Sequence, residues 1–257
     1  MDLREFFERY VFVRRCIGCG ERMGYEYRHE AFCDACRIEW ERAKNVSCPE
    51  CFAAMAECRC VPKSLSGAGV IEYRKLVAYL GDSASHPENK LLYFLKRNKN
   101  ERVASFVANQ LRYKLDDMLS ENGLCYEDVR LVYIPRSRRS CAKYGVDQSR
   151  LICEALSAVS GVECLPVIKR QKDGKLEQKK LARGNRIKNA KRLFLIDEGY
   201  ASECQGKSVI LFDDIVTSGA SMAAAAALLR GVGIEKIYAL SVAYSVKEKS
   251  RANFIFR

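Results

Sequence analysis

The stretch Val209-Ile-Leu-Phe-Asp-Asp-Ile-Val-Thr-Ser-Gly-Ala-Ser221 decides the fold that we expect for this chain. Its four opening apolar residues predict a buried central strand, and the acidic pair Asp213 and Asp214 follows at the carboxyl end of that strand. The polar turn at residues 217–221 then opens a helix. Ligands of open α/β sheets bind at the carboxyl ends of strands, and the amino termini of helices bind phosphate. The stretch therefore predicts an α/β fold with a phosphate site.

The turn and the acidic pair suit two different parts of one ligand. Backbone N–H groups and hydroxyls in the turn can donate hydrogen bonds to phosphate oxygens. Carboxylates repel phosphate, and they suit vicinal hydroxyls or a divalent cation beside the phosphate. A sugar phosphate satisfies both halves of this pattern. The alternative is an ordinary strand, turn and helix in which the aspartates only cap the helix.

Strand and helix patterns alternate along the rest of the chain. Repeated strand-then-helix order favours a mostly parallel sheet with flanking helices. The Pro- and Gly-containing residues 61–69 read as a seam, so we expect a Cys-rich module over residues 1–65 and an α/β domain over residues 66–257. A short amphipathic helix is expected at residues 2–13, and a basic loop before residue 148. Strands are predicted at residues 70–73, 75–80, 129–135, 165–168, 193–196 and 237–244, and helices at residues 91–119, 148–159 and 220–230.

Eight of the 13 cysteines lie between Cys16 and Cys60, in four close pairs. In a reducing compartment such pairs point to metal rather than to disulfides, and two C-x-x-C turns complete a tetrahedral S4 site with no open position. We expect a small zinc-ribbon module with one or two structural zinc ions. An iron–sulfur cluster, redox disulfides and a crossed pairing of the turns are alternatives. The predicted ligands are Cys16, Cys19, Cys33 and Cys36 for one ion and Cys48, Cys51, Cys58 and Cys60 for the other.

The positive charge of the chain is concentrated in its middle. Residues 130–192 hold 17 Lys and Arg against 5 Asp and Glu, a surplus of 12 that equals the net charge of the whole chain. Such a field attracts nucleic acid or phosphorylated small molecules. The alternative interpretation is a solvated Lys-rich loop that aids solubility.

The chain has no run of 18 apolar residues, so no membrane-spanning helix is expected. Its first residues carry neither the basic flank nor the apolar stretch of a signal peptide, and a cytoplasmic location is therefore the expectation.

Residues 209–221 resemble the signature with which type I phosphoribosyltransferases bind 5-phosphoribosyl-1-pyrophosphate (PRPP). The resemblance implies that Asp213 and Asp214 hold the ribose hydroxyls, and that Mg²⁺ accompanies the ligand. Some members carry an acidic residue at the position of Thr217, where it serves as a base toward a purine. Thr217 argues against purine salvage and leaves the catalytic residue unassigned. The residues implied to hold the 5′-phosphate are Thr217, Ser218, Gly219, Ala220 and Ser221.

A cysteine-pair zinc module followed by a PRPP loop resembles the ComF family of bacterial competence proteins, also described as amidophosphoribosyltransferase-like, over nearly the whole chain. Val132-Tyr-Ile-Pro-Arg-Ser-Arg-Arg139 is similar to the V-P-V-P loop of that family and its basic continuation. Tyr144-Gly-Val-Asp-Gln148 is similar to its R-G-F-N-Q segment, with Tyr, Val and Asp as departures. Residues 178–194 are similar to its Q-x-x-L-x-R-x-x-R-x-x-N-x-x-x-x-F stretch.

The resemblance implies roles for two groups of basic residues. Arg136, Arg138 and Arg139 would contact the pyrophosphate of PRPP or the backbone of a nucleic acid. Arg183 and Arg186 would belong to a mobile basic hood over the site, formed by residues 169–192.

Three functions follow as hypotheses from these implied roles. The first is a protein of DNA uptake that binds PRPP and single-stranded DNA. The second is an active phosphoribosyltransferase, which releases pyrophosphate with an unidentified amine or base as acceptor. The third is a PRPP-sensing adaptor for a DNA helicase.

Overall fold

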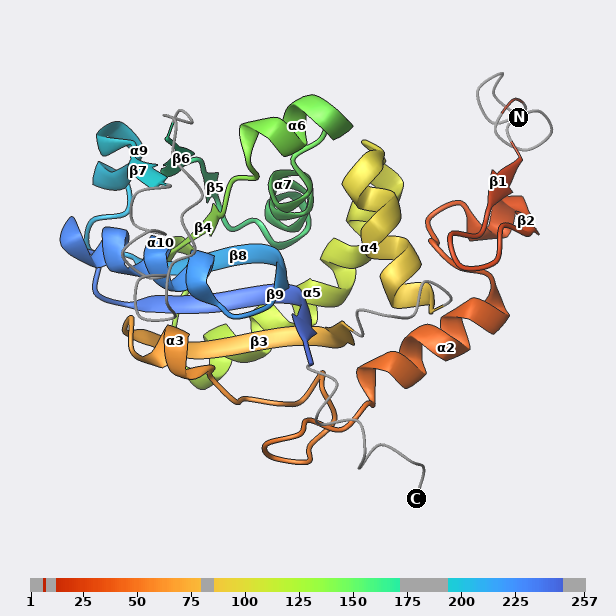
Figure 1. Cartoon of the computed structure of the whole chain (residues 1–257), viewed down its shortest axis with the longest axis horizontal. Helices are drawn as coiled ribbons and strands as arrows, with labels where there is room; N and C mark the ends of the chain where they lie inside the picture. The colour runs from red at the N-terminus through yellow and green to blue at the C-terminus, as the bar shows by residue number, and fades with distance from the viewer. Residues whose placement is uncertain (1–6, 8–12, 80–85, 172–193, 247–257) are drawn as a thin grey trace, which may run out of the picture.

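The computed structural model of the chain describes residue 7 and residues 13–79, 86–171 and 194–246. Its centre is a five-stranded sheet in the order β3-β9-β8-β4-β5, and each neighbouring pair of strands is parallel. The carboxyl ends of these strands therefore meet at one edge of the sheet (Figure 1). The strands are β3 (Val70–Tyr79), β4 (Val129–Tyr133), β5 (Cys164–Leu165), β8 (Ser208–Val216) and β9 (Ile237–Ser245).

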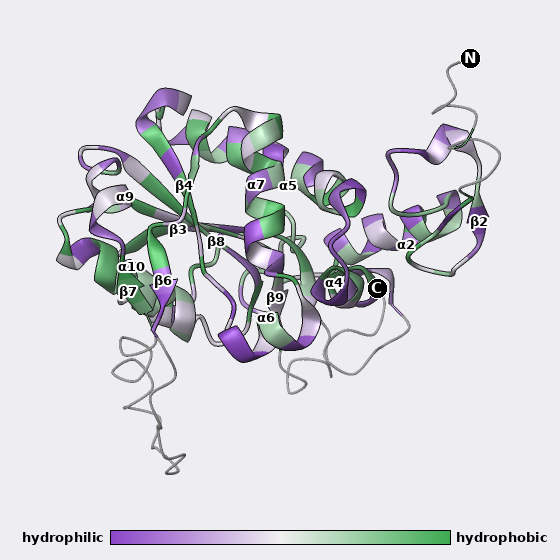
Figure 2. Ribbon diagram, turned by 90° about the horizontal axis from the view of Figure 1, so that it is seen from above, coloured by the Kyte–Doolittle hydropathy of each residue, from purple (hydrophilic) through white to green (hydrophobic). Residues whose placement is uncertain are grey.

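Helices cover both faces of the sheet, as expected for an α/β fold. On one face, α5 and α7 pack against each other and against the strands. On the other face lies α10, whose Ala-rich segment is buried and appears largely hydrophobic in Figure 2. The helices of this region are α3 (Lys63–Ser66), α4 (Pro87–Arg97), α5 (Glu101–Glu121), η2 (Tyr126–Asp128), α6 (Arg138–Tyr144), α7 (Gln148–Ser160), α9 (Glu198–Ser202) and α10 (Ala220–Gly231). A separate antiparallel pair joins β6 (Ile168–Arg170) to β7 (Phe194–Ile196).

Strand β8 shows how the apolar run at its start builds two cores at once. Side chains alternate across a strand, so Ile210 and Phe212 belong to the core on the α5 and α7 face. Val209 and Leu211 belong to the core on the α10 face. A strand buried on both faces has apolar residues at every position, which is the pattern that predicted this strand from the sequence.

The Cys-rich region precedes the sheet and packs beside it. Its elements are β1 (Arg14–Arg15), β2 (Arg22–Met23), η1 (Tyr25–Tyr27) and α2 (Asp34–Lys44). Phe32 and Trp40 are fully buried, and the ring of Phe32 meets that of Phe106 on α5 edge to face, with 5.6 Å between centroids. The fold class is thus confirmed as an α/β structure with a parallel sheet, flanking helices and a Cys-rich region at the amino terminus. The boundary between residues 65 and 66 stays a prediction.

Four predicted elements differ in detail from the structure. The strand expected at residues 165–168 is divided between β5, which joins the five-stranded sheet, and β6, which pairs with β7. The single helix expected at residues 91–119 is two helices, because the side chain of Asn100 accepts a hydrogen bond from Val103 N and caps the start of α5. The two strand candidates at residues 70–80 form one strand, β3, because both pair with β9. The basic loop expected before residue 148 contains α6, which Ser137 caps. The helix expected at residues 2–13 falls almost entirely outside the described residues.

Among the residues that the structure describes, no helix combines the length and the apolar character needed to cross a bilayer.

Candidate functional site

A cavity of about 570 Å³ opens at the carboxyl-terminal edge of the sheet. We call it the sheet-edge cavity. Five of the predicted site residues line it, although they come from segments almost 80 positions apart in the sequence. Strands β4 and β8 pair in register up to Tyr133 and Phe212, and Ile134 N then donates to Phe212 O at 2.9 Å. The segments that follow Tyr133 and Phe212 in the sequence are thereby brought together. The five predicted residues are Arg136, Arg139, Asp213, Asp214 and Ser221.

The acidic pair lies within the last four residues of β8 and is held by α7. Ser149 Oγ donates to Asp213 Oδ1 at 3.0 Å and accepts a hydrogen bond from Asp214 N at 3.3 Å. Ser149 is buried in the first turn of α7, which Asp147 caps by accepting from Arg150 N. Asp147 also accepts from Arg136 N at 3.0 Å. The start of α7 therefore positions the acidic pair and the arginine segment together.

The electrostatics of the acidic pair favour a bound partner. Burial raises the pKa of Asp213 well above its usual range, and the neighbouring Asp214 raises it further by charge repulsion and hydrogen bonding. Two carboxylates this close hold a proton between them unless a cation or hydroxyl donors stabilise the charged form. The site is consequently arranged for a ligand that brings hydroxyls or a divalent cation to β8.

The sheet-edge cavity is also lined by basic residues. Arg136 donates from Nη1 to the carbonyl oxygen of Lys96 at 2.9 Å and lies 5.0 Å from the ring centroid of Tyr144. Lys143 Nζ lies 5.1 Å from the same centroid. Lys96 and Lys143 line this cavity but were not predicted from the sequence. Charged donors of this kind bind phosphate and pyrophosphate oxygens strongly.

Three other predicted basic residues are not among the described lining residues of the sheet-edge cavity. Arg138 is exposed on α6 and is not among the lining residues. Arg183 and Arg186 lie outside the described residues, so their role in a basic hood stays a prediction.

The turn after β8 is shaped by a residue from the Cys-rich side of the chain. Gly219 caps α10 with a φ of 70°, which favours glycine. A Cβ atom there would lie 2.5 Å from Ser64 Oγ, and Ser64 Oγ donates to the carbonyl oxygen of Ser218 at 2.7 Å. Glycine is therefore required by the packing of Ser64 as well as by φ. Thr217 and Ser218 are exposed, and of the predicted phosphate-binding residues only Ser221 is among the described lining residues.

The eight predicted metal ligands form two groups of four thiols. Within each group all Sγ atoms lie within 4.8 Å of one another. The groups follow chain order, with the first four cysteines in one and the last four in the other, rather than the crossed arrangement. Four thiolates around one zinc ion at about 2.3 Å stand about 3.8 Å apart, so both groups could hold a structural zinc ion.

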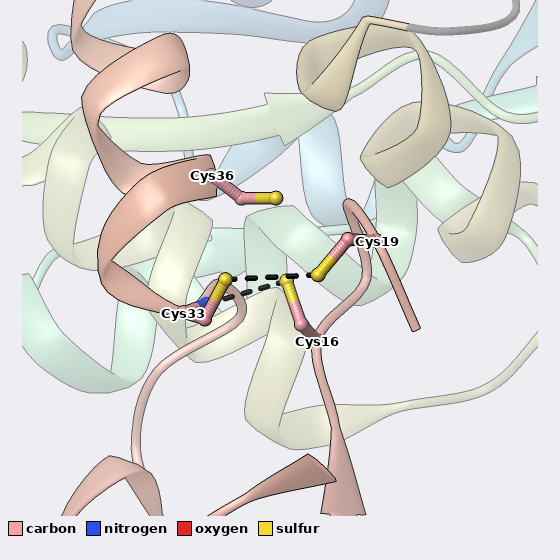
Figure 3. A group of neighbouring side chains, drawn as sticks. All are labelled: Cys16, Cys19, Cys33 and Cys36. Atoms are coloured by element: carbon pink, nitrogen blue, oxygen red, sulfur yellow. Dashed lines mark hydrogen bonds between the residues drawn. The ribbon is translucent and has the colours of Figure 1, made fainter. Parts of the chain in front are cut away.

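The first group joins a turn between β1 and β2 to the start of α2 (Figure 3). Cys19 Sγ lies 3.7 Å from Cys33 Sγ. Burial acts to raise the pKa of Cys16, but N–H donors from Cys33, Cys19 and Gly18 outweigh it and lower that pKa to about 7. Burial and the neighbouring thiols raise the pKa of Cys36. Burial also raises the pKa of Cys33, so Cys33 and Cys36 resist losing their protons, and a bound cation would stabilise them as thiolates.

The second group lies against the sheet and has a buried cation beside it. Cys51 Sγ and Cys58 Sγ are 3.6 Å apart. Lys75 on β3 is 2% exposed, and its Nζ donates to the carbonyl oxygen of Cys60 at 3.2 Å. Burial acts to raise the pKa of Cys58, but Lys75 and the N–H of Cys60 lower it to about 7. Lys75 thus offsets part of the negative charge that four thiolates around one zinc ion retain.

We expect the purified chain to contain two zinc ions, because both thiol groups fit a tetrahedral site. Cys36→Ser and Cys60→Ser should each lower the content to one ion per chain, measured by plasma mass spectrometry against protein concentration. Cys125→Ser is the control, since Cys125 is exposed and belongs to neither group. A zinc-free parent chain, or a Cys36→Ser variant that keeps two ions, would contradict this assignment.

The raised pKa of Asp213 predicts a stability that falls as pH rises. A carboxyl group whose pKa is higher in the folded than in the unfolded chain contributes stability below its ordinary value of 3.8, and this contribution is lost as pH rises through the folded value. As pH rises above 3.8, the unfolding free energy of the parent chain, measured with urea, should fall relative to that of Asp213→Asn.

Asp128→Asn serves as the control for this pH series. The hydrogen bond from Lys207 lowers the pKa of Asp128, so its titration lies below 3.8 and its contribution to stability is lost only as pH falls. Above about pH 5 the curves of the parent chain and Asp128→Asn should run parallel. Parallel curves for the parent chain and Asp213→Asn would show that the pKa of Asp213 is not raised in the folded chain.

The chain is similar along most of its length to bacterial proteins named for DNA utilization. It is 25% identical over 213 residues to the DNA utilization protein YhgH of Escherichia coli strain K12, and this match covers 81% of the chain and 88% of the relative. The Shigella flexneri protein of that name is also 25% identical, over 213 residues and with the same coverage. That of Escherichia coli O157:H7 is 26% identical over 217 residues, again with the same coverage. No protein-family model matches the chain.

Proposed function

We propose that this chain is a ComF-like protein of phosphoribosyltransferase fold, which binds PRPP and single-stranded DNA and acts in DNA uptake. The observation that carries this proposal is the composition of the sheet-edge cavity. There an acidic pair on β8, Ser221 at the start of α10 and two arginines after β4 line one space. In this proposal residues 1–65 form the zinc module and residues 66–257 the phosphoribosyltransferase-like domain.

Each part of PRPP has suitable partners among the residues of this site. Asp213 and Asp214 would accept hydrogen bonds from the ribose hydroxyls, which relieves the repulsion between the two carboxylates. The hydroxyl of Ser221 and the N–H groups of the turn would bind the 5′-phosphate. Arg136 and Arg139 would bind the pyrophosphate, and Mg²⁺ would bridge its oxygens.

The arm of the proposal that concerns DNA rests on charge and on the relatives. Proteins named for DNA utilization match 81% of the chain. Arg139 and Lys143 of α6 line the sheet-edge cavity together with Lys96 of α4, and Arg138, next to Arg139, is exposed. Such a surface attracts a polyanion, and its affinity falls as salt rises.

We assign PRPP as a bound ligand and name no catalytic base. Thr217 stands where an acidic base would be needed, and it is exposed and outside the described lining residues. Asp147, at the start of α7, accepts hydrogen bonds from Arg136 N and Arg150 N. These contacts favour a structural role for Asp147 over proton transfer.

Titration calorimetry with PRPP and Mg²⁺ tests the proposal. The parent chain should bind, and the double variant Asp213→Asn with Asp214→Asn should bind roughly 100-fold more weakly or not at all, since two hydrogen bonds to charged groups are lost. Asp116→Asn with Asp117→Asn is the matched control, because it removes an adjacent acidic pair from α5, outside the sheet-edge cavity. No heat with the parent chain, or equal affinity of the Asp213 and Asp214 double variant, would overturn the proposal.

A further inference from the structure

A second cavity, of about 580 Å³, lies between the first thiol group and the start of α5. We call it the arginine cavity. Arg14 and Arg15 reach it from β1, and Arg102 reaches it from the first turn of α5, beside the cap residue Asn100. No acidic residue is among its described lining residues. Three arginines line one hollow next to the amino terminus of a 21-residue helix, which makes the site positive. Nη1 of Arg14 also donates to the carbonyl oxygen of Arg28 at 2.6 Å, and Nη1 of Arg15 donates to that of Gly20 at 3.0 Å.

Arg102 has hydrogen-bonding capacity that its neighbours do not use. Its Nη1 atom is buried and has no hydrogen-bond partner among the described residues. Burial lowers the pKa of Arg102, and the charge of Arg14 lowers it further, while Cys16 and Glu30 act in the opposite direction. Arg102 as a whole is half-buried and lines the cavity, so its guanidinium can turn to donate to an anionic oxygen there, which would remove the cost of an unpaired buried donor.

The arginine cavity and the sheet-edge cavity are linked by the end of α4. Phe94 of this helix lines the first, and Lys96 lines the second. Helix α4 stands between α6 and β1 in Figure 1. Arg97 and Lys99, at and just after its end, are exposed. We define the basic track as Arg14, Arg15, Arg102, Lys99, Arg97 and Lys143.

Two tyrosines accompany the cations of the track. Tyr93 on α4 is 52% exposed, and the guanidinium carbon of Arg97 lies 4.1 Å from its ring centroid. Tyr144 has Arg97 at 5.8 Å and Lys143 at 5.1 Å from its ring centroid. Aromatic rings interleaved with basic side chains bind single strands, because unpaired bases can stack on rings while phosphates meet the cations.

We propose that the arginine cavity binds a backbone phosphate of single-stranded DNA, and that the strand runs along the basic track from the rim of the sheet-edge cavity to the turn between β1 and β2. This inference rests on the proposed binding of single-stranded DNA and adds the route. It places the first thiol group at the far end of the route, because Cys16 lines the arginine cavity directly after Arg14 and Arg15. The structural metal site then holds a DNA contact in place.

Fluorescence anisotropy with a labelled oligothymidine of about 20 nucleotides tests the route. The triple variant Arg14→Gln, Arg15→Gln, Arg102→Gln should bind roughly 10- to 100-fold more weakly near 0.1 M salt, and its plot of log affinity against log salt should be shallower by about 2. The matched control removes three charges at the opposite end of the strands, with Lys207→Gln, Arg230→Gln and Lys236→Gln. The control should lose little affinity.

The outcomes separate the route from the proposed function. A parent chain that does not bind the oligonucleotide at low salt overturns the binding of single-stranded DNA itself. A parent chain that binds, with equal loss in the two triple variants, overturns only the route. If the Arg102 substitution prevents folding, as judged by circular dichroism and zinc content, the exposed variant Arg15→Gln, Arg97→Gln, Lys99→Gln decides by the same criteria. A Tyr93→Leu variant with unchanged affinity would remove the stacking part of the route.

Discussion

The parallel pairing of β4 with β8 is the constraint on which the rest of this molecule depends. It runs in register from Val129 beside Ser208 to Tyr133 beside Phe212, so both strands reach the same edge of the sheet together. The arginine segment after β4 and the acidic residues of β8 are therefore neighbours. The start of α7 then fixes both, because Ser149 holds the acidic pair and Asp147 holds the backbone of the arginine segment. One pairing thus places residues of opposite charge in the lining of a single cavity.

The Cys-rich region contributes to this site as well as to the fold. Lys75 of β3 joins the second thiol group to the sheet through the carbonyl oxygen of Cys60. A few residues later Ser64 donates to Ser218 in the turn before α10, and Leu65 is fully buried. A metal ion that fixes Cys58 and Cys60 would therefore limit the movement of that turn. The thiol cluster and the turn before α10 are thereby linked in one structure.

The strands and the thiol groups could be predicted from the sequence because their signals are local. Buried parallel strands have continuous apolar runs, and each half of a thiol site is a short cysteine pair. Two contacts could not be predicted because they are distant in the sequence. Ser149 and Asp213 are separated by 64 positions, and Ser64 and Ser218 by 154 positions. The arginine cavity was missed for the same reason, because Arg14 and Arg102 lie outside the basic middle of the chain. Only the fold brings them to one place.

The central claim is that the sheet-edge cavity binds PRPP through both the acidic pair and the arginines that line it. Hydrogen exchange measured by mass spectrometry, with and without PRPP and Mg²⁺, tests this most directly because it locates the ligand on the chain. The account predicts slower exchange in peptides that cover residues 134–149 and 213–223, and unchanged exchange at the amino-terminal ends of β8 and β9. Protection confined to other segments, or no protection at saturating PRPP, would contradict it.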